Sequence, residues 1–147
     1  MKILGIIVGN GVSPDENWGP RTNKIESILK KWTRRHLTLM GKAVIVNTLV
    51  GAGLNYLGSV MACPNHWVQR ITKLIMEFYW NSKPAKLKID TITAPREMGG
   101  TGLINVQCKL WCLKCNRPAN YTSKEGKWKN LFNYWICKAS GDDNLGW

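Results

Sequence analysis

Three successive segments have apolar residues at the spacing of an α-helix. This pattern predicts that the middle of the chain forms helices that pack around a common core. In residues 23–36 the apolar positions follow the i, i+3, i+4, i+7 pattern of one helical face: Ile25, Ile28, Leu29 and Trp32. Because successive helical residues turn by about 100°, Lys30, Lys31 and Arg34 fall on the opposite face. The segment is therefore predicted to pack on one side and to present positive charge on the other.

The second segment, from Thr38 to Ser59, is apolar around nearly its whole circumference, which predicts the central helix of a bundle. The Thr38 hydroxyl is well placed to cap its start. Gly51 and Gly53 weaken the middle of this helix, each by about 1 kcal/mol relative to alanine.

A third helix is predicted from Asn65, which would act as its N-cap, to Trp80. Its inner face is formed by Trp67, Val68, Ile71, Leu74, Ile75 and Phe78. Arg70 and Lys73 lie on another face, and the loop over 82–88 then carries three lysines and no acid. The recurrence of a basic face favours a phosphate-binding role over a plain solvated surface.

The C-terminal part is predicted to be less regular. For residues 89–104 we expect a short strand or extended segment and a tight turn at Gly99-Gly100. A helix should start near Asn105. For residues 117–147 we expect a loop, a short helix over 128–138 and a frayed end.

At the N-terminus, residues 3–8 contain four Ile or Val among six and predict a strand. The chain is then mainly α, a helical bundle with a short N-terminal strand and a loop-rich C-terminal extension. Its expected divisions are residues 1–16, the bundle over 17–88 and the extension over 89–147.

Positive charge is concentrated in the predicted bundle. Residues 17–88 hold twelve Lys or Arg against two acids, which is +10 of the formal net charge of +12. This imbalance predicts a polyanionic partner.

The sequence predicts an intracellular protein, cytoplasmic or nuclear, that is not secreted and has no membrane partner. The apolar start is short for a signal peptide and is followed by Gly-Asn-Gly and acids, without a small-residue cleavage site. No run approaches the length of a membrane span. The five cysteines, an odd number without an export signal, predict reduced thiols.

Cys108, Cys112 and Cys115 share the spacing of the iron–sulfur ligands of radical-SAM enzymes, but this chain is too short for the α/β barrel of those enzymes. The three positions fall within about 60° of one helical face, which favours buried structural thiols. A zinc site would need a fourth ligand, for which His66, Cys63 and Cys137 are candidates.

Other motifs predict no chemistry. Gly41-Lys42 lacks the earlier glycine of a P-loop, and Ala43 replaces the hydroxyl that binds magnesium. His36 and His66 have no nearby partners that the sequence can identify. The tryptophans could stack on bases, but Trp32 and Trp67 lie on apolar faces, whereas Trp18 and Trp128 are less constrained.

Four segments occur in the order and at the spacing found in the reverse transcriptases of LINE-type (non-LTR) retrotransposons, just C-terminal to the polymerase palm. They are LTLMGKAVIVNTL (37–49), LNYLGSVMACP (54–64), ITKLIMEFYWNSKPAKLK (71–88) and PREMGGTGLINV (95–106). At the N-terminus, Lys2, Leu4 and Gly5 resemble the strand that closes the palm near the primer terminus, and Asn17-Trp18 resembles the next landmark. The resemblance covers roughly residues 2–138.

The resemblance implies a thumb, a helical bundle that grips the primer–template duplex, with the segment that follows it. The polymerase chemistry of the family needs a Phe/Tyr-x-Asp-Asp motif in the palm to hold two metal ions. The adjacent carboxylates of this chain, Asp142 and Asp143, lie beyond the thumb region. The chain is therefore expected to be catalytically silent, with no cofactor, metal or small-molecule substrate.

The expected partners are an RNA–DNA hybrid or another RNA or DNA duplex, and the missing palm. The basic residues predicted to contact phosphates are Lys30, Lys31, Arg34, Arg35, Lys42, Arg70, Lys73, Lys83, Lys86 and Lys88. Such contacts position a duplex without reading its sequence. Two alternatives remain open: a metal-binding module built on the cysteines, and a retrotransposon remnant without a selected function.

Overall fold

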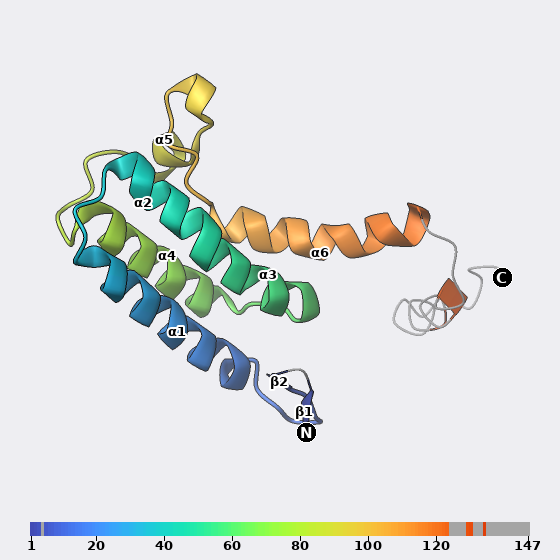
Figure 1. Ribbon diagram of the computed structural model, residues 1–147. Helices are drawn as coiled ribbons and strands as arrows, with labels where there is room; N and C mark the ends of the chain where they lie inside the picture. Colours follow the sequence, from blue (N-terminus) through green and yellow to red (C-terminus); the bar gives the residue numbers. More distant parts are fainter. Residues whose placement is uncertain (4, 124–128, 131–133, 135–147) are drawn as a thin grey trace. The chain divides into compact units, whose positions relative to one another are not determined.

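The computed structural model describes residues 1–3, 5–123, 129–130 and 134. The chain separates into two compact units, Met1–Lys114 and Cys115–Trp147. In the first unit α1 packs along α4, and the helical stretch from α2 to α3 contacts both of them (Figure 1). The helices of this bundle are α1 (Asp15–Thr33), α2 (Leu39–Ile45), the π-helical η1 (Val46–Val50), α3 (Gly51–Val60) and α4 (Asn65–Trp80). The fold is therefore mainly α, as predicted.

The predicted N-terminal strand is a small hairpin. β1 (Lys2–Ile3) pairs antiparallel with β2 (Ile6–Ile7). Gly5 lies between them with a φ of 84°, a conformation that glycine adopts without strain. The Asn17 side chain joins the hairpin to α1, because it accepts a hydrogen bond from the Ile7 N–H at 2.8 Å and donates to the Ile7 carbonyl at 2.9 Å.

The first long helix starts earlier than the sequence predicted. α1 begins at Asp15 and runs through Pro20. Its buried face therefore includes Trp18, which is 0% exposed and whose Nε1 donates to the Ala62 carbonyl at 3.0 Å. The prediction that Trp18 is weakly constrained is wrong, since this side chain joins α1 to the loop before α4.

The second helix forms as predicted at its start but is not enclosed on all sides. The Thr38 hydroxyl accepts a hydrogen bond from the Gly41 N–H at 3.1 Å, which confirms the cap. Val46, Val50 and Leu54 are fully buried. However, Val44 remains 48% exposed, so the apolar ring is covered by helices on part of its circumference only. The prediction of a central helix is corrected to one that flanks α1 and α4.

Leu39–Val60 is also the one stretch of the described chain that is long and apolar enough to cross a membrane, with 22 residues and a mean hydropathy of 1.4. The expectation that no run approaches that length is therefore wrong. Length and composition are shared with the core helices of water-soluble proteins, and 39% of an apolar 18-residue window of this stretch is buried within the protein.

The third predicted helix has the expected bounds. In α4 the buried residues include Val68, Ile71, Ile75 and Phe78, all from the predicted inner face. Asn65 is the first helical residue, and Pro64 occupies the N-cap position without a side-chain hydrogen bond. The helix ends at Trp80, and its C-cap residue, Asn81, has a φ of 52° in the left-handed region.

The segment after α4 differs from the prediction. Residues expected to be extended form a short helix, α5 (Ile89–Thr93), followed by a 3-10 turn, η2 (Arg96–Met98). The expected turn is present: Gly99 has a φ of 79°, and a Cβ on Gly100 would lie 2.0 Å from the Ala94 carbonyl oxygen. Only glycine fits so close an approach of two backbone segments.

The last described helix, α6 (Val106–Ser123), starts where the sequence predicted, because the Asn105 side chain accepts a hydrogen bond from the Cys108 N–H at 3.1 Å. It continues over 117–123, where a loop was expected. The helix predicted over 128–138 and the frayed end lie largely outside the described residues.

Gly58 and α6 approach each other closely. A Cβ on Gly58 would lie 2.6 Å from Leu110 Cδ2, so α6 packs onto α3 through a position that has no side chain. Val106 and Leu110 are buried on this face of α6. Cys108, Cys112 and Cys115 are turned about half a revolution away and are exposed. The prediction that these thiols are buried is therefore wrong.

Candidate nucleic-acid interface

The basic face predicted for the first helix is present on α1. Lys30, Lys31 and Arg34 are exposed on the side that faces away from Ile25 and Leu29, which are buried. These three cations line a hollow of about 510 Å³ together with Asn23, Glu26 and Ser27. One side of the helix therefore packs against the core, and the other side forms a concave basic surface.

Glu26 partly neutralises this surface. Its carboxylate lies 2.6 Å from Lys30 Nζ, one helical turn away, and 3.8 Å from Arg70 Nη2 of α4. The hydrogen bond and the charge of Lys30, with the charge of Arg70, hold the pKa of Glu26 below its ordinary value. Lys30 nevertheless keeps 75% of its side chain exposed, so it can turn to a phosphate by releasing a weak surface ion pair.

Arg35, Arg70 and Lys73 are also exposed. The Arg35 guanidinium lies over the Trp32 ring at 4.6 Å, and Arg70 lies over Trp67 at 5.5 Å. These contacts hold the side chains in place without cancelling their charge. Lys73 of α4 lines a hollow of about 420 Å³ with Lys83 of the following loop, so the structure brings together two cations that are ten positions apart.

The loop lysines are placed as the sequence predicted. Lys83, Lys86 and Lys88 are all exposed, in a segment where every residue from 81 to 90 is exposed. None of these three lysines has an ion pair within the described residues. Their charge is therefore available to a polyanion.

Lys42 is the exception, and the prediction that it contacts phosphate is corrected. Its side chain is 4% exposed, and its Nζ donates to the Phe78 and Tyr79 carbonyls at 3.1 and 3.0 Å. A third bond of 2.6 Å reaches Asn81 Oδ1. Lys42 thus satisfies the terminal carbonyls of α4, where a cation is also favoured by the helix dipole. Burial lowers the pKa of its ammonium group.

The sequence interpretation missed a second basic stripe on the same helix. Arg21 and Lys24 precede Lys31 at positions i, i+3 and i+10, which share one side of the helix. No acid of α1 falls on that side. The signal was present in the sequence, but it becomes visible only when the helix is known to begin at Asp15.

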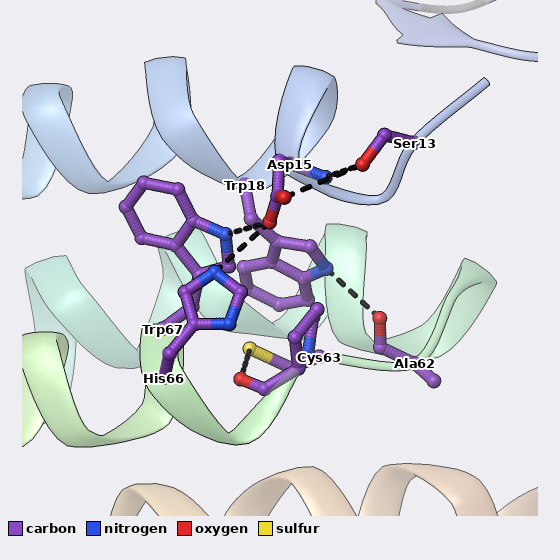
Figure 2. Close-up of polar contacts among 8 residues, drawn as sticks. Ser13, Asp15, Trp18, Ala62, Cys63, His66 and Trp67 are labelled. Carbon is purple, nitrogen blue, oxygen red and sulfur yellow. Dashed lines mark hydrogen bonds and ion pairs between the residues drawn. The ribbon is translucent and has the colours of Figure 1, made fainter.

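Among the residues that the structure describes, one polar cluster could suggest catalysis, and it joins the starts of α1 and α4 (Figure 2). The Asp15 carboxylate accepts hydrogen bonds from Trp67 Nε1 at 2.5 Å, from His66 Nε2 at 2.9 Å and from the Ser13 hydroxyl at 3.3 Å. The carboxylate lies in the middle, so Ser13 contacts the acid and not the histidine. A hydrolytic triad needs the opposite order, with the histidine between nucleophile and acid.

Cys63 lies beside this cluster, and its thiol contacts the Pro64 carbonyl at 3.6 Å (Figure 2). Burial raises the pKa of this thiol to about 12, so it is protonated at neutral pH and is a poor nucleophile or metal ligand. The cluster is therefore a structural clamp between two helices.

A metal site has no support in the described part of the chain. No group of three His, Cys, Asp or Glu residues is arranged there to hold an ion. Cys137, one candidate for a fourth ligand, lies outside the described residues.

The chain matches no family model, no curated protein and no solved structure at a significant level. The resemblance to the thumb of LINE-type reverse transcriptases therefore stays a prediction from the sequence.

Proposed function

We propose that this chain is a nucleic-acid-gripping module, a thumb-like part of the RNA-directed DNA polymerase of a LINE-type retrotransposon, and that it holds a primer–template duplex through backbone phosphates. It performs no chemistry by itself. In the complete polymerase, a palm would supply the Asp-Asp pair that binds the metal ions. The order and spacing of the four resembling segments support the polymerase origin.

One observation carries the binding part of this proposal. The cations of α1 lie on surfaces that the core does not use, and Lys31, Arg34 and Arg35 have no ion pair within the described chain. An exposed cation without an acid partner gains most from a phosphate, because binding releases the counterions condensed on the nucleic acid. Lys30 and Arg70 share Glu26 and should contribute less.

The proposal is tested by charge reversal on α1. A variant with Lys30→Glu, Lys31→Glu and Arg34→Glu should bind an RNA–DNA hybrid at least about tenfold more weakly at moderate salt. Its log–log salt slope should fall by about 3, since each lost phosphate contact removes about 0.9 on B-form DNA and a similar amount here. Fluorescence anisotropy against salt concentration measures both quantities.

A matched control carries the same change of net charge at three other basic positions, Arg96→Glu, Lys109→Glu and Lys114→Glu. This variant should lose less affinity, because only the long-range attraction changes. If the two triple variants lose equal affinity and equal slope, the α1 surface is not the contact. If neither changes, the chain does not bind through these helices.

A further inference from the structure

We propose that a separate hollow, bounded by Lys2, Arg21, Lys24 and Tyr56, binds the phosphorylated terminal nucleotide of a nucleic-acid strand. The hollow has a volume of about 440 Å³ and lies where the N-terminal hairpin, α1 and α3 meet. This volume is within the range of about 300–1,000 Å³ that is typical of small-ligand sites. None of the four residues belongs to the surface predicted from the sequence.

The charge of the hollow distinguishes it from the others on this molecule. Three cations line it and no carboxylate does, whereas the hollow of about 430 Å³ at the far ends of α1 and α4 contains Glu26 and Glu77. Lys2, Arg21 and Lys24 make no ion pair within the described residues. Three converging positive charges without a counter-charge form a site for an anion that carries more than one negative charge.

That requirement favours a phosphomonoester over an internal phosphodiester. A terminal phosphate carries about −1.5 to −2 charges at neutral pH, whereas each internal phosphate carries one. The planar guanidinium of Arg21 can donate two parallel hydrogen bonds to such a group, and the lysines add point charges. A Cβ on Gly53 would lie 4.0 Å from Arg21 Cδ, so the glycine keeps the helix surface low beside the stem of this arginine.

The remaining wall of the hollow suits a nucleoside. Tyr56 is 41% exposed, while its neighbour Leu57 is 4% exposed and belongs to the core. A half-exposed aromatic ring beside a phosphate site provides a face on which a base can stack, and stacking tolerates any base. The ligand class is therefore a phosphorylated nucleotide, free or at the end of a strand.

The basic stripe of α1 favours the strand end, and this step rests on the proposed function. From Arg21 and Lys24, which line the hollow, the basic stripe continues along α1 to Lys31. The ten residues from Arg21 to Lys31 correspond to about 15 Å of helix at 1.5 Å per residue. A strand whose backbone follows this stripe reaches the hollow with its terminal nucleotide.

The test compares two RNA–DNA hybrids of one sequence, each with a single-stranded 5′ overhang, that differ only in a 5′-phosphate or a 5′-hydroxyl. Fluorescence anisotropy with a label at the opposite end gives both affinities. The unmodified chain should bind the phosphorylated hybrid at least about fivefold more tightly. Arg21→Gln with Lys24→Gln should remove this preference, and Lys109→Gln with Lys114→Gln, at positions outside both basic surfaces, should keep it.

Equal affinity of the unmodified chain for both hybrids would overturn the inference, as would a preference that survives Arg21→Gln with Lys24→Gln. Competition with a free nucleoside monophosphate separates the two sources. If it binds in an Arg21-dependent way while the hybrids bind equally, the ligand is a free nucleotide and the strand-end assignment fails.

A different result would contradict the proposed function, so the strand-end site and the duplex grip can be tested separately. Weak binding of both hybrids, unaffected by charge reversal at Lys30, Lys31 and Arg34, would remove the duplex grip. Far-UV circular dichroism of each variant verifies that its helices are intact.

Discussion

At the scale of single residues, the buried contacts of Lys42 give it a structural role in place of the phosphate contact that its sequence predicted. By its sequence it is a helix-borne cation among other cations, but its ammonium group caps α4 through the Phe78 and Tyr79 carbonyls. Helical periodicity placed Lys42 on a face without showing which neighbour covers that face. Periodicity also does not predict that Asn81 adopts a left-handed conformation and supplies a further acceptor to Lys42.

Lys42→Met tests this structural role. The variant keeps the length of the side chain but leaves buried carbonyls without a donor, which should cost about 1–3 kcal/mol of unfolding free energy. Its affinity for a hybrid, measured well below its melting temperature, should not change. Lys31→Met is the matched control, with a stability change within about 0.5 kcal/mol and weaker binding. Loss of affinity in Lys42→Met with unchanged stability would return Lys42 to the phosphate surface.

Residue spacing predicted faces correctly, but not always what the faces do. Cys108, Cys112 and Cys115 do share one side of α6, as expected from their spacing. The buried side is set by Val106 and Leu110, which pack under the constraint of Gly58 on α3. The sequence alone could not say which of the two sides of α6 meets the core.

At the scale of helices, α1 explains both a success and a failure of the sequence interpretation. Ile25 and Leu29 are buried as predicted. The start was placed too late, at residue 23, because the prediction rested on the apolar spacing that begins at Ile25. Pro20 lies within the helix. Asp15 and Glu16 occupy its first turn, where the helix dipole stabilises acidic side chains. With this start, Thr22 and Trp18 extend the buried face from Ile25 by a step of three residues and then a step of four.

The glycines of α3 also acquire a reason. Glycines lower the stability of a helix, and this low stability is what a poorly folding retrotransposon remnant would show. Gly51 is buried, and a Cβ there would lie 3.5 Å from Ile104 Cδ1, while Gly58 admits Leu110. Gly58 therefore allows α6 to pack closely on α3, so part of the lost helix propensity is offset there by contacts between elements, whereas a Cβ at Gly51 would meet Ile104 at an ordinary contact distance.

The clamp between α1 and α4 should make the stability of the bundle depend on pH. The hydrogen bond from Trp67, with His66 and Ser13, holds the pKa of Asp15 below its ordinary value of 3.8. Because the folded-state pKa is the lower one, the stabilisation is complete above about pH 3.8 and is lost as the pH falls through the folded-state value. Acid should therefore loosen the starts of the two helices.

Asp15→Asn tests this dependence by thermal unfolding at pH 7, 4 and 2. The variant should melt at a lower temperature than the unmodified chain at pH 7, and the difference should shrink towards pH 2. Glu16→Gln, a change of the same charge at the neighbouring exposed position, should show no such pattern. A difference in melting temperature that is the same at all three pH values would show that Asp15 does not act through its charge.

At the scale of the whole molecule, the core of the described chain is contained in the first unit. Its buried apolar residues lie between Ile6 and Leu110, and the unit itself is Met1–Lys114. A chain that ends at Lys114 should therefore keep a cooperative unfolding transition, seen together in far-UV and near-UV circular dichroism, since Trp18 and Trp80 are buried within it.

The shortened chain also separates a working module from a remnant. Residues 115–147 carry five Lys or Arg and three acids, so their removal changes the net charge by only two. The affinity for a hybrid and its salt slope should then stay close to those of the full chain, because the α1 surface is retained. A shortened chain with helical far-UV signal but no near-UV signal would be a molten state and would favour a remnant. A cooperative, hybrid-binding unit would place the grip within Met1–Lys114.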